Sequence, residues 1–242
     1  IAILRVFLKE NGIKINQKFK FVCGHSLGEF TALCAANVIS LKDTAYLLKI
    51  RGQSMQEAVP QGKGSMAALI SSDFSELNNL LNLGKQIGVC EIANHNSSEQ
   101  IVISGHKKAV KEVVDNSSKF LIKKALLLNV SAPFHCSLMM PAQIRLQNEL
   151  KNIIFNEPDL PIICNYTAVS ETNTLKLKNN IINQVTSKVR WKETMDYALK
   201  NKINKVLECG SGKVLSGLFK RFSKDFNVYN IETIEDLKKI EI

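Results

Sequence analysis

The chain has 242 residues, of which 45% are hydrophobic and 22% are charged, with a formal net charge of +10. This composition excludes a disordered chain, and no apolar run approaches the roughly 18 residues of a membrane span. The basic residues indicate an acidic partner or a solvated lysine-rich surface, and they argue against nucleic acid because no aromatic residues are interleaved with them.

The first residues predict a helix over 1–10 and a polar connection over 11–18. Since the chain begins with Ile1 rather than Met, we expect a processed or truncated piece. The apolar run Phe19-Lys20-Phe21-Val22 predicts a short strand, and the alanine-rich segment up to about residue 37 predicts a helix.

Between this strand and helix stands Gly24-His25-Ser26-Leu27-Gly28. A serine between two glycines at a strand-to-helix corner is the pattern of a nucleophile elbow, whose hydroxyl projects from a tight turn. The amides at the start of the following helix point to the place where negative charge develops on an attacked carbonyl. The alternative is a glycine-rich turn with an incidental serine.

Farther along, the patterns predict a helix over 40–59 and a loop over 61–65 that could join two domains. Strands over 66–70, 87–93, 100–104 and 120–128, with helices over 73–83 and 105–118, give the order β-α-β-β-α-β of ferredoxin-like units. Helices over 140–151, 176–186 and 191 onward, with extended segments over 160–165, 205–208 and 228–231, complete the chain.

We therefore predict an α/β fold with two parts. A large α/β-hydrolase-like domain with a mostly parallel sheet spans 1–61 and 131–242, and a ferredoxin-like (βαββαβ) small domain is inserted over 62–130. The six cysteines lack C-x-x-C spacing and the four histidines are scattered, so the sequence predicts neither a metal site nor a disulfide framework, and it favours a reducing compartment.

A serine nucleophile needs a base, and His135 is the best-placed histidine, in a turn where the chain returns to the large domain. A structural histidine in that turn is the alternative. Several further motifs stand in order along the chain: Gly24-His25-Ser26-Leu27-Gly28-Glu29, Arg51-Gly52, Gly64-Ser65-Met66, Asn94 with Asn96, Ser131-Ala132-Pro133-Phe134-His135, Gln184, Trp191 and Glu208-Cys209-Gly210-Ser211-Gly212.

Together these motifs resemble the malonyl-CoA:acyl carrier protein transacylases of fatty-acid synthesis and, more distantly, the acyltransferase domains of polyketide synthases. The resemblance implies that Ser26 attacks the malonyl thioester, with His135 as general base and the backbone carbonyl of Gln184 holding the imidazole. It implies that Arg51 pairs with the free malonyl carboxylate, for which a planar guanidinium is well suited.

The resemblance also implies the remaining substrate contacts. The backbone N–H of Leu27 would be one oxyanion donor, and His25, Asn94 and Asn96 would line the substrate site. Phe134 resembles the bulky residue of malonyl-selective domains, where a ring crowds an α-methyl group. The second oxyanion donor of the family lies in a Gly-Gln-Gly segment that this sequence lacks, so we expect an upstream segment that carries it.

The predicted function is transfer of malonyl from malonyl-CoA to the phosphopantetheine thiol of an acidic acyl carrier protein, with no cofactor beyond these substrates. A serine esterase or thioesterase, and a silent carrier-protein-binding module, are the alternatives. We expect a monomer that binds neither membrane nor nucleic acid, in a plastid-type organelle (apicoplast-like) or a bacterial-type cytoplasm. Two departures stand out: Ser211 where the family commonly has proline, and Thr186-Ser187-Lys188 after the glutamine.

Overall fold

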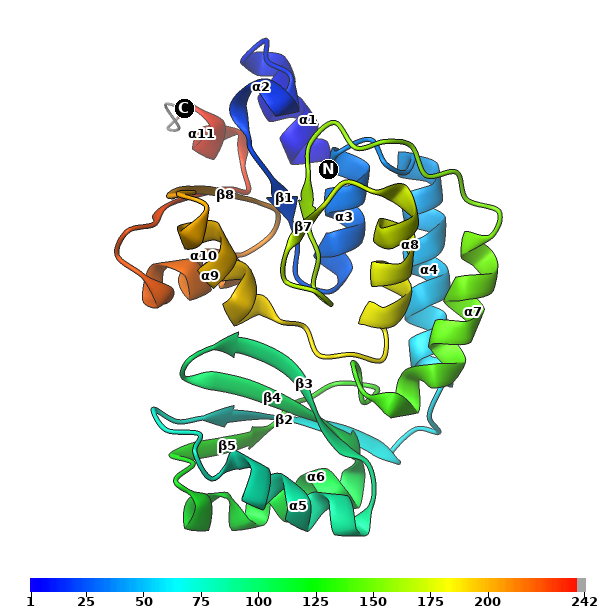
Figure 1. Ribbon diagram of the computed structural model, residues 1–242, viewed down its shortest axis with the longest axis vertical. Coiled ribbons are helices and arrows are strands. Elements are labelled where there is room, and N and C mark those ends of the chain that lie inside the picture. Colours follow the sequence, from blue (N-terminus) through cyan, green and yellow to red (C-terminus); the bar gives the residue numbers. More distant parts are fainter. Residues whose placement is uncertain (239–242) are drawn as a thin grey trace.

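A four-stranded sheet with two helices lies beneath a larger assembly of helices and short strands in the computed structural model, which describes residues 1–238 (Figure 1). The lower unit contains β2 (Gly64–Ile70), α5 (Leu77–Ile87), β3 (Cys90–Ser97), β4 (Gln100–His106), α6 (Lys107–Asn116), η1 (Ser117–Phe120) and β5 (Lys124–Leu127). Its strands are arranged in the order β3-β4-β2-β5, and each neighbouring pair is antiparallel.

The sequence of β2 explains why both faces of this sheet are covered. Successive side chains of a strand point to opposite faces. Ala67 and Leu69 pack into a core with α5 and α6, which lie together on one face of the sheet (Figure 1). Met66 and Ala68 pack on the other face, against Phe134 among others. Since both faces of β2 are buried, apolar residues follow one another along this strand instead of alternating with polar ones.

The upper assembly contains two further, separate hydrophobic cores. Its elements are α1 (Ala2–Glu10), α2 (Ile15–Lys18), β1 (Val22–Cys23), α3 (Leu27–Ala35), α4 (Leu41–Glu57), η2 (Ser137–Met139), α7 (Met140–Leu150), β6 (Ile162–Ile163), β7 (Ser170–Glu171), α8 (Thr174–Gln184), α9 (Trp191–Lys200), β8 (Lys205–Cys209), α10 (Val214–Phe222), β9 (Asn227–Ile231) and α11 (Ile234–Leu237). Helices α3, α4, α7 and α8 supply half of the apolar residues that the core around them buries, and the connecting segments supply most of the others.

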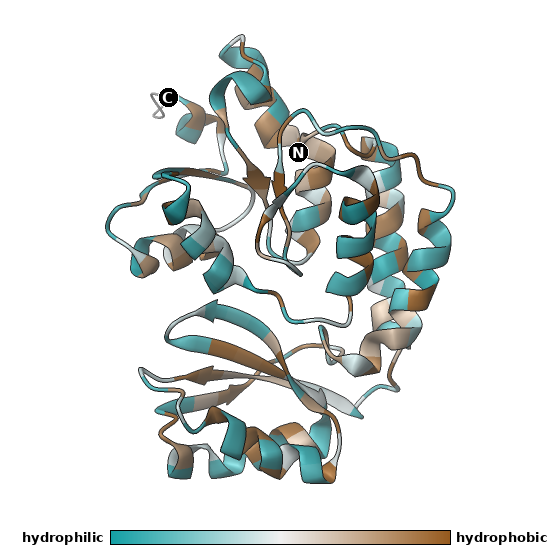
Figure 2. Cartoon of the chain, viewed as in Figure 1, coloured by the Kyte–Doolittle hydropathy of each residue, from teal (hydrophilic) through white to brown (hydrophobic). Residues whose placement is uncertain are grey.

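Helices α4, α7 and α8 each present one face to the core, whereas α3 is buried on nearly all sides. On α4 the buried residues Leu47 and Met55 lie about two helical turns apart, so both point to the same side. Ser40 caps this helix, because its side-chain oxygen accepts a hydrogen bond from the amide of Asp43. Figure 2 shows hydrophobic and hydrophilic residues alternating along α4, α7 and α8, as expected of helices with one buried side.

The sheet of the upper assembly differs from the prediction of one mostly parallel sheet. β1 and β6 are parallel, β6 and β7 are antiparallel, and β8 and β9 form a separate parallel pair. Of the strand predicted over 19–22, only Val22 is paired, and the observed strand β1 continues to Cys23. Pro161 has no N–H to extend the ladder before Ile162, and Gly24 begins the turn after Cys23.

Several helices and strands begin or end at other residues than predicted. The strand predicted over 120–128 begins only at Lys124, because Leu121 adopts a left-handed conformation with φ 62° after a short 3₁₀ helix. Four residues of the polar connection form α2, and β7 and α11 were not predicted. None of the six cysteines forms a disulfide. Within residues 1–238, no helix combines the length and apolarity needed to cross a bilayer.

Candidate active site

The serine turn has the strained geometry of a nucleophile elbow. Ser26 lies between β1 and α3 with φ 53° and ψ −102°, a conformation that non-glycine residues rarely adopt. The flanking Gly24 is required by a close approach, since a Cβ atom there would lie 2.1 Å from the backbone carbonyl of Gly28. The turn is thus too tight for a side chain on one flank, and it presents the serine hydroxyl at its tip.

A buried asparagine, Asn165, is hydrogen-bonded to the backbone of this turn at two positions. The Ser26 amide donates to Oδ1 of Asn165 at 2.6 Å, and Nδ2 of Asn165 donates to the Gly24 carbonyl at 2.8 Å. Asn165 is fully buried and follows β6, the strand that pairs in parallel with β1. Both strands therefore deliver their next residues to the same edge of the sheet. These two hydrogen bonds offset part of the strain at Ser26.

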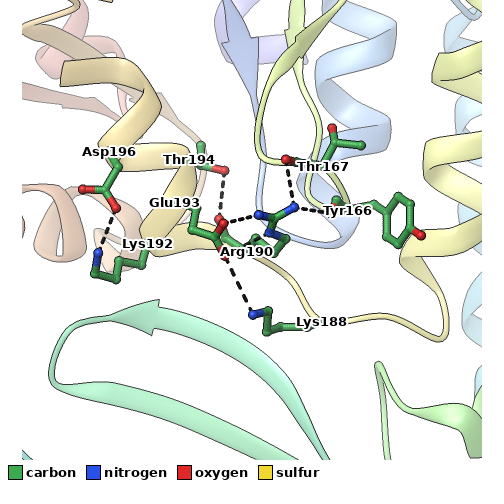
Figure 3. Close-up of polar contacts among 8 residues, drawn as sticks. All are labelled: Tyr166, Thr167, Lys188, Arg190, Lys192, Glu193, Thr194 and Asp196. Carbon is green, nitrogen blue, oxygen red and sulfur yellow. Dashed lines mark hydrogen bonds and ion pairs between the residues drawn. The ribbon is translucent and has the colours of Figure 1, made fainter. Parts of the chain in front are cut away.

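The segment that carries Asn165 is itself fastened by Arg190 (Figure 3). The Arg190 amide donates to the Asn165 carbonyl at 3.1 Å, and its guanidinium donates to the Thr167 carbonyl at 3.0 Å. Figure 3 also shows the guanidinium paired with both carboxylate oxygens of Glu193, on the first turn of α9. Arg190 thus ties the loop beneath the elbow to the start of α9.

Ser26, His135 and Gln184 form one chain of hydrogen bonds. Oγ of Ser26 lies 2.7 Å from Nε2 of His135, and Nδ1 of His135 lies 2.8 Å from the backbone oxygen of Gln184. A carbonyl oxygen can only accept, so Nδ1 carries the proton and Nε2 is free to accept from the serine hydroxyl. This arrangement can activate a nucleophile.

The environment keeps the imidazole of His135 neutral. Burial is the main cause and the nearby Arg51 guanidinium is the second, and together they lower the pKa of His135 to about 3. The side chain is only 4% exposed. The histidine is therefore an unprotonated base over the whole neutral range.

Arg51 reaches the serine from the middle of α4. Its Nη2 donates to Oγ of Ser26 at 2.8 Å and to Oε1 of Gln184 at 3.1 Å, and the residue is only 7% exposed. Burial lowers the pKa of Arg51 to about 10, which leaves the guanidinium charged at neutral pH. A buried cation beside the nucleophile can bind an anionic group of a substrate.

Glu29 lies directly behind these residues and is 1% exposed. Its Oε2 accepts from Nε2 of Gln184 at 2.7 Å and from the amide of Asn165 at 3.1 Å. Burial raises the pKa of Glu29 to about 7, against the opposing effect of these hydrogen bonds and of Arg51. The carboxyl group thus joins the elbow, the Asn165 loop and the end of α8.

The remaining candidates lie around this centre. Leu27 is the first residue of α3, where a backbone N–H has no partner within the helix, and its side chain is 55% exposed. The ring of His25 lies 2.9 Å from Oδ1 of Asn96 and contacts Trp191. The ladder between β3 and β4 shifts register between His95 and Ser97, a bulge that frees Asn96 to turn toward His25.

Asn94 and Phe134 also lie outside the hydrogen-bonded centre. Asn94 is buried where β3 forms a bridge with Val189, and no hydrogen bond within residues 1–238 joins its side chain to the serine or histidine. Phe134 is half-buried and packs against both the upper core and the far face of the small sheet. Both lie on segments that lead into the site.

Residues 8–222 match the acyl transferase domain family. The chain belongs to this family. The acyltransferase is 35% identical over 219 residues to the malonyl CoA-acyl carrier protein transacylase of Staphylococcus aureus (strain MSSA476), covering 90% of this chain and 71% of the relative. It is 38% identical over 221 residues to the enzyme of the same name from Escherichia coli (strain K12), covering 91% and 70%.

Solved structures agree with this assignment. The acyltransferase superposes on an acyl-carrier-protein S-malonyltransferase from Bartonella henselae with a TM-score of 0.94 and 44% identity, covering 98% of this chain and 76% of the other. A malonyl-transacylase solved with its type II PKS acyl-carrier protein gives a TM-score of 0.93 and 35% identity, with the same coverage. The resemblance found in the sequence motifs is therefore confirmed.

Two residues of the acyltransferase site were missed as separate candidates. Glu29 is the last residue of the serine motif, but nothing in the sequence indicates which residues it contacts. Asn165 carried a usable signal, because a polar residue directly after a buried strand lies at the edge where α/β proteins place their sites. No group of three or more His, Cys, Asp or Glu side chains that could hold a metal occurs over residues 1–238.

Proposed function

We propose that this acyltransferase moves a malonyl group from malonyl-CoA to the phosphopantetheine thiol of an acyl carrier protein, through an ester on Ser26. The family and the names of the relatives support an acyl transfer of this kind. The observation that carries the choice of substrate is the Arg51 guanidinium, 2.8 Å from the Ser26 hydroxyl and buried. A buried cation at that distance favours an acyl group that ends in a carboxylate.

In the first half-reaction, His135 Nε2 takes the hydroxyl proton while Ser26 Oγ bonds to the thioester carbon. The carbonyl oxygen becomes an oxyanion, to which the Leu27 amide at the start of α3 can donate. The intermediate then expels the CoA sulfur, which receives the proton from His135. CoA leaves, and the malonyl group stays as an ester on Ser26.

The second half-reaction reverses these proton movements. The carrier thiol gives its proton to His135, its sulfur bonds to the ester carbon, and Ser26 Oγ leaves with the proton from His135. The thiol replaces water as acceptor, and this distinguishes a transferase from a hydrolase. Gln184 holds the imidazole through a neutral carbonyl, which fixes the tautomer but stabilises an imidazolium less than a carboxylate does.

The site residues come from two units that we propose to be separate domains. Residues 62–130 form an inserted ferredoxin-like unit, and residues 1–61 with 131–238 form an α/β-hydrolase-like domain, whose predicted end at residue 242 lies outside the described residues. The strand order β3-β4-β2-β5 with both helices on one face supports the first assignment. The parallel pair β1 and β6 beneath the elbow supports the second. His25, Asn94, Asn96 and Phe134 would line the substrate path between them.

Malonyl-CoA and intact-mass measurement test the proposal directly. The wild-type protein should gain a malonyl adduct that disappears when a carrier protein or a pantetheine thiol is added, and Ser26→Ala should gain none. Absence of an adduct on the wild type would favour a silent binding module. An adduct that persists in Ser26→Ala would exclude the serine ester, and release of malonate to water as the main product would favour a hydrolase.

A further inference from the structure

The side chain of Gln184 has its own set of contacts, distinct from those of its backbone. The backbone oxygen accepts from His135, whereas the side-chain amide points to the other side of the serine. There Oε1 accepts from Arg51 Nη2 at 3.1 Å, and Nε2 donates to Glu29 Oε2 at 2.7 Å and to the Ser26 carbonyl at 3.0 Å. All of its hydrogen-bonding capacity except one lone pair is used in this way.

These contacts fix which way the amide faces. Glu29 also accepts from the Asn165 backbone, so its carboxyl is anchored independently of Gln184. An anchored acceptor on one side of the amide forces Nε2 toward Glu29 and leaves Oε1 toward Arg51. With the amide reversed, its NH₂ group would face the guanidinium, and two donors would oppose each other in a buried site.

Within the described part of the chain, the guanidinium of Arg51 is hydrogen-bonded through Nη2 but not through Nε. Nη2 is occupied by Ser26 and Gln184, whereas Nε, although buried, has no hydrogen-bond partner within residues 1–238. The guanidinium carbon lies over the Phe30 ring, 5.5 Å from its centroid. An unpaired buried donor of a charged group is costly unless a ligand pairs with it.

We propose that Glu29 and the Gln184 side chain are positioning residues, which together orient the Arg51 guanidinium toward the carboxylate of the acyl substrate. The inference rests on the proposed function, because it names what makes that site selective for an anionic acyl group. Glu29 fixes the amide, the amide fixes Nη2, and Nε is left as a buried donor without a partner within residues 1–238, available to a substrate carboxylate. None of these steps involves the backbone carbonyl that orients His135.

The test compares single-turnover acylation of Ser26 by malonyl-CoA and by acetyl-CoA in three variants. Gln184→Met removes the side-chain amide and keeps the backbone carbonyl. Glu29→Leu removes the anchoring acceptor, and Glu29→Gln removes the charge but keeps an oxygen that can accept from Gln184 and Asn165. We expect the malonyl-to-acetyl rate ratio to fall about tenfold in Gln184→Met and Glu29→Leu, the size of one charge-assisted hydrogen bond. Glu29→Gln should retain most of the ratio.

The outcomes separate this inference from the proposed function. A wild type that forms no malonyl ester would overturn the proposed function itself. A wild type that is acylated, with the ratio unchanged in Gln184→Met, would overturn only the positioning role. Equal losses for both acyl groups in a variant with wild-type thermal unfolding would also overturn it, since a merely structural residue does not distinguish the two substrates. If Glu29→Leu fails to fold, Gln184→Met decides alone.

Discussion

The backbone oxygen of Gln184 lies 2.8 Å from Nδ1 of His135, and no acidic side chain of residues 1–238 takes that place. The imidazole is therefore oriented by a neutral acceptor in a buried setting, beside the cation of Arg51. These surroundings explain why the folded protein disfavours protonated His135 so strongly.

Protonation of His135 should make the protein less stable in acid. Its pKa falls from the ordinary 6.5 of a histidine in the unfolded chain to about 3 in the folded protein. As the pH falls below 6.5, the unfolded chain takes up a proton that the folded protein does not, so the stability present above pH 6.5 is lost toward pH 3. The difference in unfolding free energy between wild type and His135→Asn should shrink by up to about 1.4 kcal/mol per pH unit.

Urea unfolding of both proteins across this pH range checks the prediction. Glu29 acts in the opposite sense, because its raised pKa of about 7 lowers stability as the pH rises above 4.5. It is present in both proteins and so cancels in the difference. Parallel pH profiles for wild type and variant would contradict a buried neutral histidine.

Arg51 should determine which acyl groups are accepted. Arg51→Ala should lower the rate of Ser26 acylation by malonyl-CoA about 10- to 100-fold, the range of a lost charge-assisted hydrogen bond, while acylation by acetyl-CoA should fall less. Arg51→Lys should lie between, since an ammonium cannot donate two parallel hydrogen bonds to a carboxylate. Acylation followed by mass spectrometry measures both rates, and an unchanged preference in Arg51→Ala would remove the arginine from substrate recognition.

Two glycines of the elbow should respond differently to the same substitution. Gly24→Ala places a Cβ 2.1 Å from the Gly28 backbone, and we expect a loss of about 3 kcal/mol or more in unfolding free energy. Gly28→Ala meets no atom within 4 Å and lies in α3, so stability should stay level or rise by up to about 1 kcal/mol. Denaturant unfolding of the pair measures this contrast, and similar losses in both would contradict the tight crossing at Gly24.

Asn165 should be important for the elbow itself. Asn165→Ala leaves the Ser26 amide and the Gly24 carbonyl without their buried partners, at about 1–3 kcal/mol for each group. Asn201→Ala is the matched control, because that asparagine is exposed and its effect should stay within about 0.5 kcal/mol. Thermal unfolding compares the two, and equal shifts would argue against a specific role for Asn165.

Transfer to a carrier protein should be more sensitive to salt than transfer to a small thiol. The net charge of +10 includes Lys107, Lys108, Lys213, Lys220 and Arg221, which we propose as contacts for an acidic carrier. Salt screens attraction between exposed charges over about 10 Å at 0.1 M. Initial rates with carrier protein and with pantetheine, measured over a salt series, test this, and equal salt dependence would remove the electrostatic contribution.

The sequence by itself determined the serine elbow, the order of most helices and strands, the family and the pairing of His135 with Ser26. These features depend on local patterns: glycine spacing at a tight turn, apolar periodicity within a helix or strand, and motifs in a fixed order. Where the pattern failed, a local constraint was the reason, as at Pro161, which limits β6 and its partner β1 to two residues each.

Only the tertiary structure decided how Glu29, Asn165 and the Gln184 side chain meet. Gln184 is 155 residues from Glu29 and 133 from Arg51 along the chain, and Asn165 is 139 from Ser26. Their hydrogen bonds exist because α3, α4 and α8 pack around one core and exclude water from the space between them. No local periodicity encodes a contact of that range, since burial and hydrogen-bond geometry arise only when the helices are packed together.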